Sequence, residues 1–333
     1  MTVTPPNLAQ ARPTPWLETG WMDAATTWIQ RQIAAAGVGP VLGIAPEKVS
    51  ARSAVYRVQT AGARLFFKAG PLHTSHEPAL TAWLAKHAPA HIARVVAVDT
   101  GRCWMLTHDV RGRSLADTSD IDHWRRAVAA LARMQRDCAA CADDLFEAGC
   151  RDRSLPWLAR HLTDLVDGGL PPGLTADEQR RIECALPRWS ELAADATLAG
   201  VPDVTLDHAD LHPRNVVVTA AGPVFLDWEG AALGHPFTSL AILLGYMEHL
   251  LPALAPARAA LRDAYLAPWT ACAPMPALVE AFERHRPLAS LKYAVGLSRL
   301  LAVRAQFDSA EDVAGTRAAI LQCLRTALNE SLL

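Results

Sequence analysis

The sequence predicts an α+β protein with two parts, a small β-rich N-terminal lobe and a large, mostly helical C-terminal lobe. Three observations predict this class. Short β-type runs joined by turns fill the first third of the chain, and apolar side chains recur at helical spacing after residue 107. One isolated β-rich insert then spans residues 203–228. The 333 residues are enough for a substantial buried core.

The N-terminal lobe is expected over residues 21–107, after a loose leader at residues 1–20 whose prolines disfavour a helix. A helix capped by Asp23 is expected over residues 23–36. A second, short helix is expected to open at Glu77, with Pro78 at its first position. Strands are expected at residues 41–49, 54–60, 64–68, 92–98 and 103–106.

The C-terminal lobe is expected over residues 108–333 and is dominated by helices. Thr175 and Glu178 have the spacing of a capping box and predict the start of one helix, which either continues through Pro187 or is interrupted there. From Phe237 onward we expect helices throughout, punctuated by prolines. A further helix is indicated by the spacing of Ile121, Trp124, Val128, Leu131 and Met134.

Composition excludes several classes of protein. Lys and Arg number 32 and Asp and Glu 34, which gives a formal charge of −2 and argues against a nucleic-acid partner. No apolar run has the roughly 18 to 20 residues of a membrane span. The N-terminus has prolines where a signal peptide needs an apolar core, so we expect a cytoplasmic protein. Seven cysteines at irregular spacings do not predict a disulfide framework.

The insert holds the strongest candidate for a catalytic site. Two strand-like runs, residues 215–219 and 223–228, flank a turn and predict a hairpin with Asn215 and Asp227 at its open end. Asp210 lies in the loop that enters that end. Asn and Asp oxygens suit Mg²⁺, and a separate Asp can accept the proton of an attacking hydroxyl. The spacing is therefore typical of phosphoryl transfer from ATP, with Asp210 as base and Asn215 and Asp227 as Mg²⁺ ligands. The alternative is a surface turn in which Asp and Asn act as caps.

Lys68 is the candidate for binding the nucleotide phosphates. It ends an apolar strand in a chain that has 28 Arg but only four Lys, which favours a need for a compact point charge at this position. Glu77, at the start of the following helix, is its natural ion-pair partner. Solvated side chains at a strand end and at a helix start are the alternatives for these two residues.

These residues resemble a known family, that of the aminoglycoside phosphotransferases and choline kinase-like enzymes. The motifs that carry the resemblance are His208-Ala-Asp210-Leu-His-Pro-Arg-Asn215, Leu226-Asp227-Trp-Glu229 and Gly234-His-Pro236, with Trp104 to Gly112 similar to the interlobe hinge. The resemblance implies a bilobal protein-kinase-like fold. It assigns Asp210, Asn215, Asp227 and Lys68 the roles given above, and it implies that adenine meets backbone groups near His108 and Val110.

Two positions depart from the family pattern. The phosphate loop, usually rich in glycine, reads Ser50-Ala-Arg-Ser53-Ala54, so that backbone N–H groups and the Ser53 hydroxyl are left to reach phosphate. The family also often has an acidic residue shortly after Gly-x-Pro, where this chain has Ser239. We expect a different local hydrogen-bond pattern at Ser239.

The acceptor of the phosphate stays open at this point. The enzyme is expected to phosphorylate a hydroxyl of a small molecule, either an antibiotic such as an aminoglycoside or a metabolite of the choline, homoserine or sugar type. The sequence argues against a protein kinase, because only about eight residues separate Trp228 from the helix near Phe237 and leave no room for a long activation segment. The remaining alternatives are an inactive nucleotide-binding pseudokinase and a metal-dependent hydrolase built on His208, Asp210 and His212.

Overall fold

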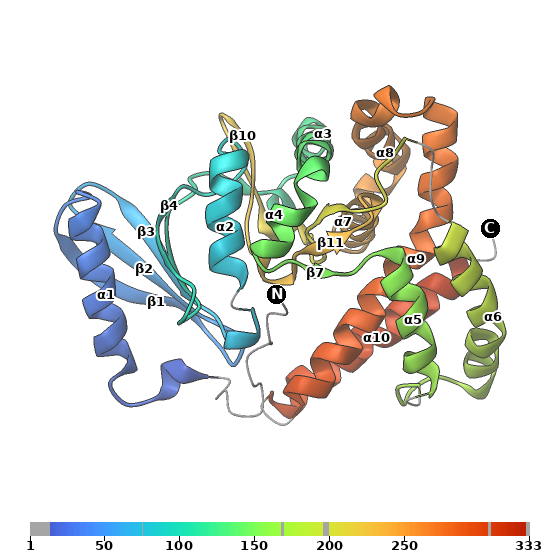
Figure 1. Ribbon diagram of the computed structural model, residues 1–333, viewed down its shortest axis with the longest axis horizontal. Coiled ribbons are helices and arrows are strands. Elements are labelled where there is room, and N and C mark those ends of the chain that lie inside the picture. Colours follow the sequence, from blue (N-terminus) through green and yellow to red (C-terminus); the bar gives the residue numbers. More distant parts are fainter. Residues whose placement is uncertain (1–13, 75, 168–169, 196–199, 306–307, 331–333) are drawn as a thin grey trace. The chain divides into compact units, whose positions relative to one another are not determined.

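The computed structural model describes residues 14–74, 76–167, 170–195, 200–305 and 308–330, which form two compact units (Figure 1). The first unit comprises the described residues up to Arg113, with Glu147–Cys150 and Val217–Gly230. The second comprises Ser114–Phe146, Arg151–Val216 and the described residues from Ala231 onward. The division into lobes at residue 107 stays a prediction. Of the predicted leader, residues 1–13 lie outside the described part of the chain.

The first unit is built on a five-stranded antiparallel sheet in the order β1-β2-β3-β5-β4. The expected strands at residues 41–49 and 54–60 are confirmed to the residue. The strand expected at residues 92–98 begins later, and Ile92 forms only an isolated bridge with Phe225. The strands are β1 (Val41–Val49), β2 (Ala54–Thr60), β3 (Arg64–Ala69), β4 (Val95–Asp99) and β5 (Trp104–His108).

Helix α1 (Trp21–Ala35) runs along this sheet (Figure 1). It begins two residues before the predicted cap Asp23, because Gly20, at φ 81°, takes the N-cap position. Its buried side chains pack on inward-facing residues of β2, β3 and β5 and form a core that includes Trp28, Ile29, Ile33, Val58, Leu65, Phe67, Trp104 and Leu106. Each large side chain buried in this way stabilises the unit by roughly 1.5–3 kcal/mol.

The second unit is mostly helical, as the sequence predicts. The Thr175–Glu178 capping box forms: the Thr175 hydroxyl accepts from the Glu178 N–H, and the Glu178 carboxylate accepts from the Thr175 N–H. Pro187 lies inside α6, which therefore continues through it. The helices are α3 (Ile121–Cys138), α4 (Ala142–Glu147), α5 (Leu155–Asp167), α6 (Ala176–Asp195), α7 (Phe237–Leu250), α8 (Arg258–Leu266), α9 (Met275–Arg304) and α10 (Ala310–Glu330).

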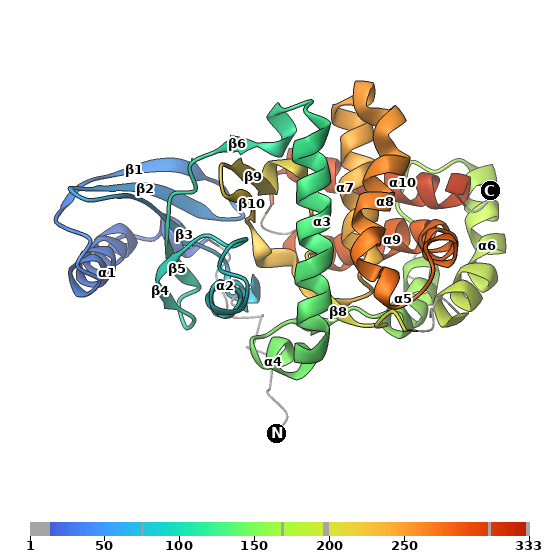
Figure 2. The ribbon, with the colours of Figure 1, turned by 90° about the horizontal axis from the view of Figure 1, so that it is seen from above.

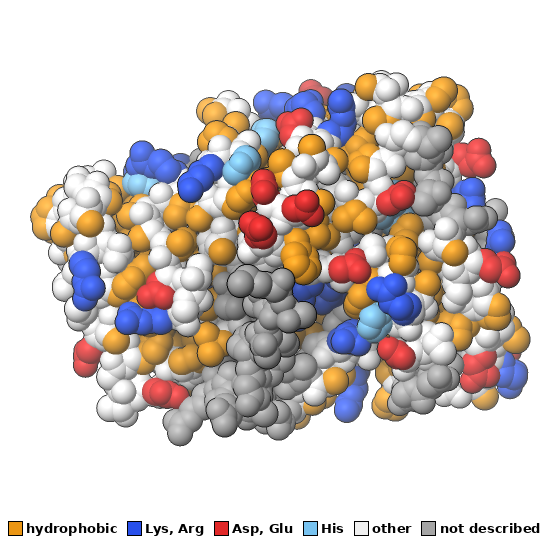
Figure 3. Space-filling model, in the orientation of Figure 1, with side chains coloured by type: hydrophobic (Ala, Val, Ile, Leu, Met, Phe, Trp, Pro, Cys, Tyr) orange, Lys and Arg blue, Asp and Glu red, His pale blue; other side chains and the backbone are white. Residues whose placement is uncertain are grey.

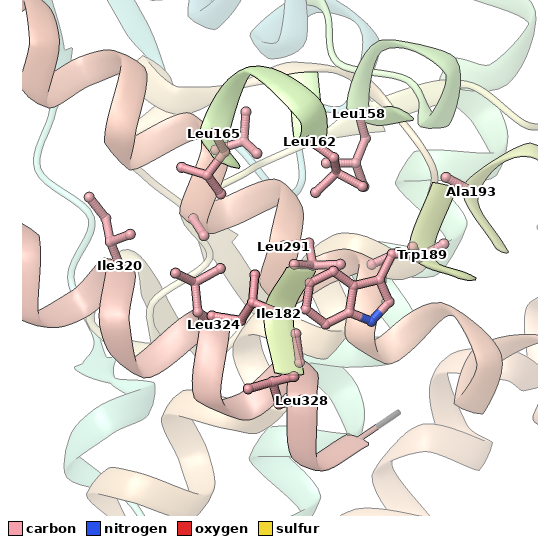
Figure 4. Close-up of a cluster of buried hydrophobic side chains, with 14 of the residues drawn as sticks. Leu158, Leu162, Leu165, Ile182, Trp189, Ala193, Leu291, Ile320, Leu324 and Leu328 are labelled. Atoms are coloured by element: carbon pink, nitrogen blue, oxygen red, sulfur yellow. The ribbon is translucent and has the colours of Figure 1, made fainter. Parts of the chain in front are cut away.

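Helix packing determines the interior of the second unit. Helix α8 packs against α3 and contacts α7 (Figure 2), and α9 contacts α7, α8 and α10. The helices α5, α6, α9 and α10 enclose a cluster of buried apolar side chains that includes Trp189 (Figure 4). Leu158, Leu162, Leu291 and Leu324 are among its members. Helix α9 is thus held in place by the surrounding helices, and so are the side chains that it contributes to other parts of the second unit.

The β-rich insert divides into short strands. β8 (Thr205–Asp207) pairs with β11 (Ala232–Gly234), which pairs in turn with β7 (Arg151–Asp152). The remaining strands are β6 (Arg113–Ser114) and the predicted hairpin pair β9 (Val216–Thr219) and β10 (Gly222–Phe225).

The predicted strands of the hairpin were too long. Asn215 ends a 3-10 turn (Pro213–Asn215), because Pro213 starts a helical turn that the ring of His212 caps. Asp227 follows β10 with a left-handed φ of 65°, which ends the extended run. The two residues therefore flank the hairpin strands and do not belong to them.

Helix α2 (His76–His87) begins before the predicted start, so Glu77 lies at its second position and Pro78 at its third, where the first was expected. On the face shown in Figure 3, basic and acidic side chains are interspersed with hydrophobic ones. None of the helices in the described residues has the length and apolar character needed to span a membrane.

Candidate active site

Lys68 and Glu77 form a buried ion pair in the first unit. Lys68 lies near the end of β3, and its Nζ is 2.7 Å from Oε1 of Glu77 on α2. The exposed fractions of the two side chains are 13% and 2%. The sequence predicted this partnership from the position of Glu77 at a helix start. The role of the pair in nucleotide binding stays a prediction.

Two further carboxylates from the insert surround the same ammonium group. Asp227 Oδ1 lies 2.5 Å from Lys68 Nζ, and Glu229 Oε2 lies 3.6 Å away. Glu229 belongs to a 3-10 turn (Trp228–Gly230) that directly follows Asp227. The left-handed backbone of Asp227 is rare for a residue other than glycine, and such strain is concentrated at functional sites. Sequence reasoning missed Glu229, although it stands two residues from a predicted ligand.

This cluster of charges shifts the protonation equilibria of its members. Burial disfavours the charged form of Lys68, but Glu77, Asp227 and Glu229 outweigh it and hold the pKa of the ammonium well above its ordinary value. Burial raises the pKa of Glu77 to about 7, with Lys68 opposing this rise and Asp227 and Glu229 adding to it. Three carboxylates thus share one ammonium, and the cluster has an excess of negative charge.

The same three carboxylates form a group that suits a hard divalent cation. One ligand oxygen from each of Glu77, Asp227 and Glu229 lies within 4.8 Å of the others. Mg²⁺ prefers oxygen ligands and usually takes one or two protein carboxylates together with substrate phosphates. Asp227 is the most accessible of the three, since its side chain is 40% exposed. The residues present therefore fit a magnesium ion.

Asp210 and Asn215 meet in the second unit. The side-chain amide of Asn215 donates to the backbone carbonyl of Asp210 at 3.1 Å, and this bond closes the loop between them. The carboxylate of Asp210 accepts a hydrogen bond from the hydroxyl of Tyr293 on α9, at 2.9 Å from Oδ1. The hydroxyls of Tyr293 and Tyr246 on α7 lie 3.1 Å apart. The predicted base is therefore fixed by a tyrosine pair that the sequence did not reveal.

A buried polar network supports the loop before Asp210. Asp207 is fully buried and accepts from Lys292 Nζ and from the Ser239 hydroxyl, each at 2.6 Å. Ser239 in turn accepts from the backbone N–H of His208 at 3.0 Å. Ala209, at φ 58°, donates its N–H to Asp207. At the position where the family often has an acidic residue, Ser239 thus binds the loop backbone through its hydroxyl. The carboxylate of this network is supplied by Asp207.

Sequence reasoning singled out His208 and Ser239 but missed Asp207, Ala209 and Lys292 as members of this network. Lys292, like Lys68, is one of only four lysines in the chain, so the scarcity of lysine could have singled it out. Asp207 adjoins the motif directly and had no separate signal, because its ion-pair partner lies 85 residues away.

The predicted phosphate-loop residue Ser53 lies in the turn between β1 and β2. The hydroxyl of Ser50 accepts from the backbone N–H groups of Arg52 and Ser53, at 3.1 and 3.3 Å. Ser50 also donates its own N–H to the Ser53 carbonyl at 3.0 Å. The side chain of Ser50 therefore organises this turn, which contains no glycine.

His108 ends β5, opposite Leu65 of β3, and Val110 follows two residues later. The backbone N–H of His108 donates to Arg94, and that of Asp109 donates to Arg64. Burial, with repulsion from Arg94, lowers the pKa of the His108 imidazole. Both predicted adenine neighbours are half-buried; His108 lies on the same sheet as Lys68, and Val110 follows the end of its strand.

The hydrolase alternative requires His208, Asp210 and His212 to share one strand face. Strand β8 ends at Asp207, and the residues that follow form a loop in which His212 caps the 3-10 turn. The geometry therefore gives no support to a metal site of this kind.

Comparison with known proteins places these residues in context. A model of a phosphotransferase enzyme family matches residues 46–277, which include both clusters except Lys292 and Tyr293. A search of the curated proteins found no match.

Solved structures with the same fold include several small-molecule kinases. A choline kinase from Streptococcus pneumoniae has 13% identity and a TM-score of 0.60, over 91% of this chain and 99% of that one. A choline/ethanolamine kinase family protein from Mesorhizobium loti has 18% identity and a TM-score of 0.59, over 92% and 98%. The aminoglycoside phosphotransferase APH(4)-Ia, in complex with ADP and hygromycin B, has 12% identity and a TM-score of 0.56, over 90% and 98%. These likenesses confirm the predicted kinase-like fold.

Proposed function

The chain belongs to the phosphotransferase enzyme family, and on that premise we propose that it transfers the γ-phosphate of ATP to a hydroxyl group of a small molecule. The observation that carries the proposal is the contact of Lys68 with Glu77 and Asp227, at 2.7 and 2.5 Å. A strand lysine held by a helix glutamate, beside an aspartate that can bind metal, is the arrangement used to hold nucleotide phosphates.

Each predicted residue has a role in this proposal. Lys68 binds the phosphates and Glu77 orients it, while backbone groups near His108 and Val110 meet the adenine. The Ser53 hydroxyl is the proposed phosphate contact of the Ser50–Ser53 turn, since the N–H groups of Ser50, Arg52 and Ser53 are hydrogen-bonded within the turn. Asp210 accepts the proton of the acceptor hydroxyl, and the 2.9 Å hydrogen bond from Tyr293 orients its carboxylate.

Asp227 and Asn215 are the proposed ligands of Mg²⁺, with Glu229 as a further oxygen beside Asp227. When bound, the ion supplies positive charge that neutralises the phosphate oxygens during transfer. The relatives that bind ADP and hygromycin B or phosphorylate choline support a small hydroxyl acceptor, either an antibiotic or a metabolite.

The test is ATP consumption over a panel of antibiotics, aminoalcohols, sugars and hydroxy acids. Asp210→Ala should abolish turnover and leave Mg-ATP binding intact, since the residue acts on the acceptor and not on the nucleotide. Lys68→Met should weaken ATP binding, and Lys48→Met, which removes an exposed lysine of β1, is its matched control. Turnover by Asp210→Ala at the wild-type rate would refute the proposal, whereas ATP binding without transfer to any compound would favour a pseudokinase.

A further inference from the structure

A small cavity lies in the second unit beside Tyr293, the residue whose hydroxyl donates to Asp210. It has a volume of about 20 Å³ and is lined by Arg153, Asp207, Ala209, Thr238, Ile242, Lys292 and Tyr293. Two of these residues connect it to the proposed base: Ala209 precedes Asp210, and Tyr293 donates to its carboxylate. The cavity can hold about one water-sized group, and therefore one oxygen atom of a larger ligand.

Charge in the wall of this cavity is not balanced. Lys292 and Asp207 neutralise each other through their 2.6 Å contact. Arg153 adds a second cation, and within the described residues its guanidinium makes no ion pair and no hydrogen bond. Burial, together with repulsion from Arg151 and Arg299, lowers the pKa of Arg153, and attraction to Asp207 opposes this shift only in part. Arg153 is half-buried, so its guanidinium N–H donors are partly removed from water, and within the described residues no carboxylate or carbonyl oxygen accepts from them.

The position of Arg153 is nevertheless fixed by packing. Its guanidinium carbon lies 5.3 Å from the ring centroid of Trp157 on α5, which is a cation–π contact. On the other side it approaches α9 at Gly296, where a Cβ atom would stand 2.5 Å from Nη1. The glycine therefore leaves the space that the guanidinium occupies. A preorganised donor group of this kind suits bidentate recognition of a carboxylate or phosphate.

From this geometry, and resting on the proposed kinase activity, we infer that the acceptor substrate carries an anionic group, a carboxylate or a phosphate, which Arg153 binds while the acceptor hydroxyl lies at Asp210. Four lining residues, Arg153, Ala209, Ile242 and Tyr293, are only half-buried, so this wall is in part accessible. Small hydroxy acids, sugar acids and amino acids with a hydroxyl group have the required chemistry. Polycationic antibiotics do not, since Arg153 would repel them.

The first experiment compares matched acceptors that differ in one carboxylate, such as D-glycerate with glycerol and D-gluconate with sorbitol. We expect the acid of at least one pair to be phosphorylated with a kcat/KM at least tenfold above its neutral counterpart. Arg153→Met should remove this preference, Arg153→Lys should restore part of it, and neither should change the KM for ATP. Arg151→Met, at an exposed neighbour, is the control for general loss of positive charge. A preference for neutral or cationic acceptors, or equal losses on all acceptors in Arg153→Met, would overturn the inference.

A binding measurement separates failure of this inference from failure of the proposed activity. Inorganic phosphate should raise the thermal unfolding temperature of the wild-type protein and of Lys68→Met, whose nucleotide site is weakened, but not that of Arg153→Met. This result stands even where no compound in the panel is phosphorylated, in which case only the kinase proposal fails. Equal shifts in wild type and Arg153→Met, or no shift in wild type, would refute an anion site at Arg153.

Discussion

Lys292 Nζ donates to Oδ2 of Asp207 over 2.6 Å, and both side chains are almost entirely removed from solvent. The pair links α9 to the strand that enters the loop of Asp210. The pair also requires glycine at position 234, because a Cβ atom there would collide with Nζ of Lys292 and crowd the carboxylate of Asp207. The pair therefore fixes the base loop to the most firmly packed helix of the second unit.

Removing one partner of this pair should destabilise the protein strongly. Lys292→Met leaves the Asp207 carboxylate buried without its cation, and we expect a loss of about 3–5 kcal/mol in the free energy of unfolding. Denaturant titration measures this loss. Lys48→Met, at an exposed position, should change the free energy by less than about 0.5 kcal/mol. The double variant Asp207→Leu with Lys292→Met should recover part of the stability, and a double variant less stable than Lys292→Met would contradict this account.

Ser239 should matter more for turnover than for nucleotide binding. Its hydroxyl accepts from the His208 N–H and donates to Asp207, so Ser239→Ala leaves a buried N–H without an acceptor, at a cost of about 1–3 kcal/mol. The strained backbone at Ala209 then loses support, and Asp210 is displaced.

We therefore expect Ser239→Ala to lower kcat about tenfold or more, with the KM for ATP within twofold of wild type. Steady-state kinetics with a compound from the acceptor panel checks this. Ser190→Ala, at a half-buried serine of α6, should leave both constants unchanged. A rise in the KM for ATP with unchanged kcat would show that Ser239 serves the nucleotide instead.

Local sequence signals predicted most of the fold. Strands β1 and β2 and the box of Thr175 and Glu178 depend on neighbouring residues only, so periodicity and capping located them correctly. The ends of the hairpin were wrong, because the conformations of Asn215 and Asp227 depend on a proline turn and on a left-handed φ. Neither feature has a periodic pattern.

The same difference separates the site residues that the sequence predicted from those that it missed. Lys68 and Glu77 stand nine residues apart in sequence, and a strand followed by a helix was enough to pair them. Tyr293 meets Asp210 across 83 residues and Lys292 meets Asp207 across 85. Such contacts arise from the packing of α9 against α7, which no local pattern encodes. Arg153 contacts Trp157, which is close to it in sequence. Its position in the same cavity wall as Lys292 and Tyr293, however, depends on the packing of α9.

Tyr293 should act on the base through its hydroxyl. Tyr293→Phe keeps the ring and removes the 2.9 Å hydrogen bond to Asp210, so the carboxylate is no longer oriented and Tyr246 loses its partner. A hydrogen bond to an ionised carboxylate is worth about 1.5–3 kcal/mol, so we expect kcat to fall about ten- to a hundredfold. Tyr246→Phe, one bond further from the base, should have a smaller effect.

Kinetics of the two tyrosine variants, with protein integrity checked by thermal unfolding, test this order. Tyr56→Phe, on the sheet of the first unit, is the matched control. A larger loss in Tyr246→Phe than in Tyr293→Phe would reverse the order and argue against positioning of Asp210 by Tyr293.

Two stacked histidines predict that the protein is sensitive to acid. His235 and His285 are buried with ring centroids 4.2 Å apart, and His235 Nδ1 accepts from the backbone N–H of Phe237 at the start of α7. Burial, with repulsion from Lys292, lowers the pKa of His235 to about 3. Burial and repulsion from His235 and Lys292 hold the pKa of His285 well below its ordinary value.

The sign of the pH dependence follows from these depressed pKa values. The unfolded chain takes up protons near pH 6.5 and the folded chain does not, so their contribution to stability is complete above pH 6.5 and is lost as the pH falls toward 3. Between pH 7 and pH 5 we expect the free energy of unfolding to fall by about 2 kcal/mol for each histidine.

Denaturant titrations of wild type and of the double variant His235→Asn with His285→Gln measure this fall. The double variant should be less stable at pH 7 but should lose less on acidification, whereas His249→Asn, at an exposed position, should follow the wild-type curve. Parallel curves for wild type and the double variant would show that other groups cause the acid sensitivity.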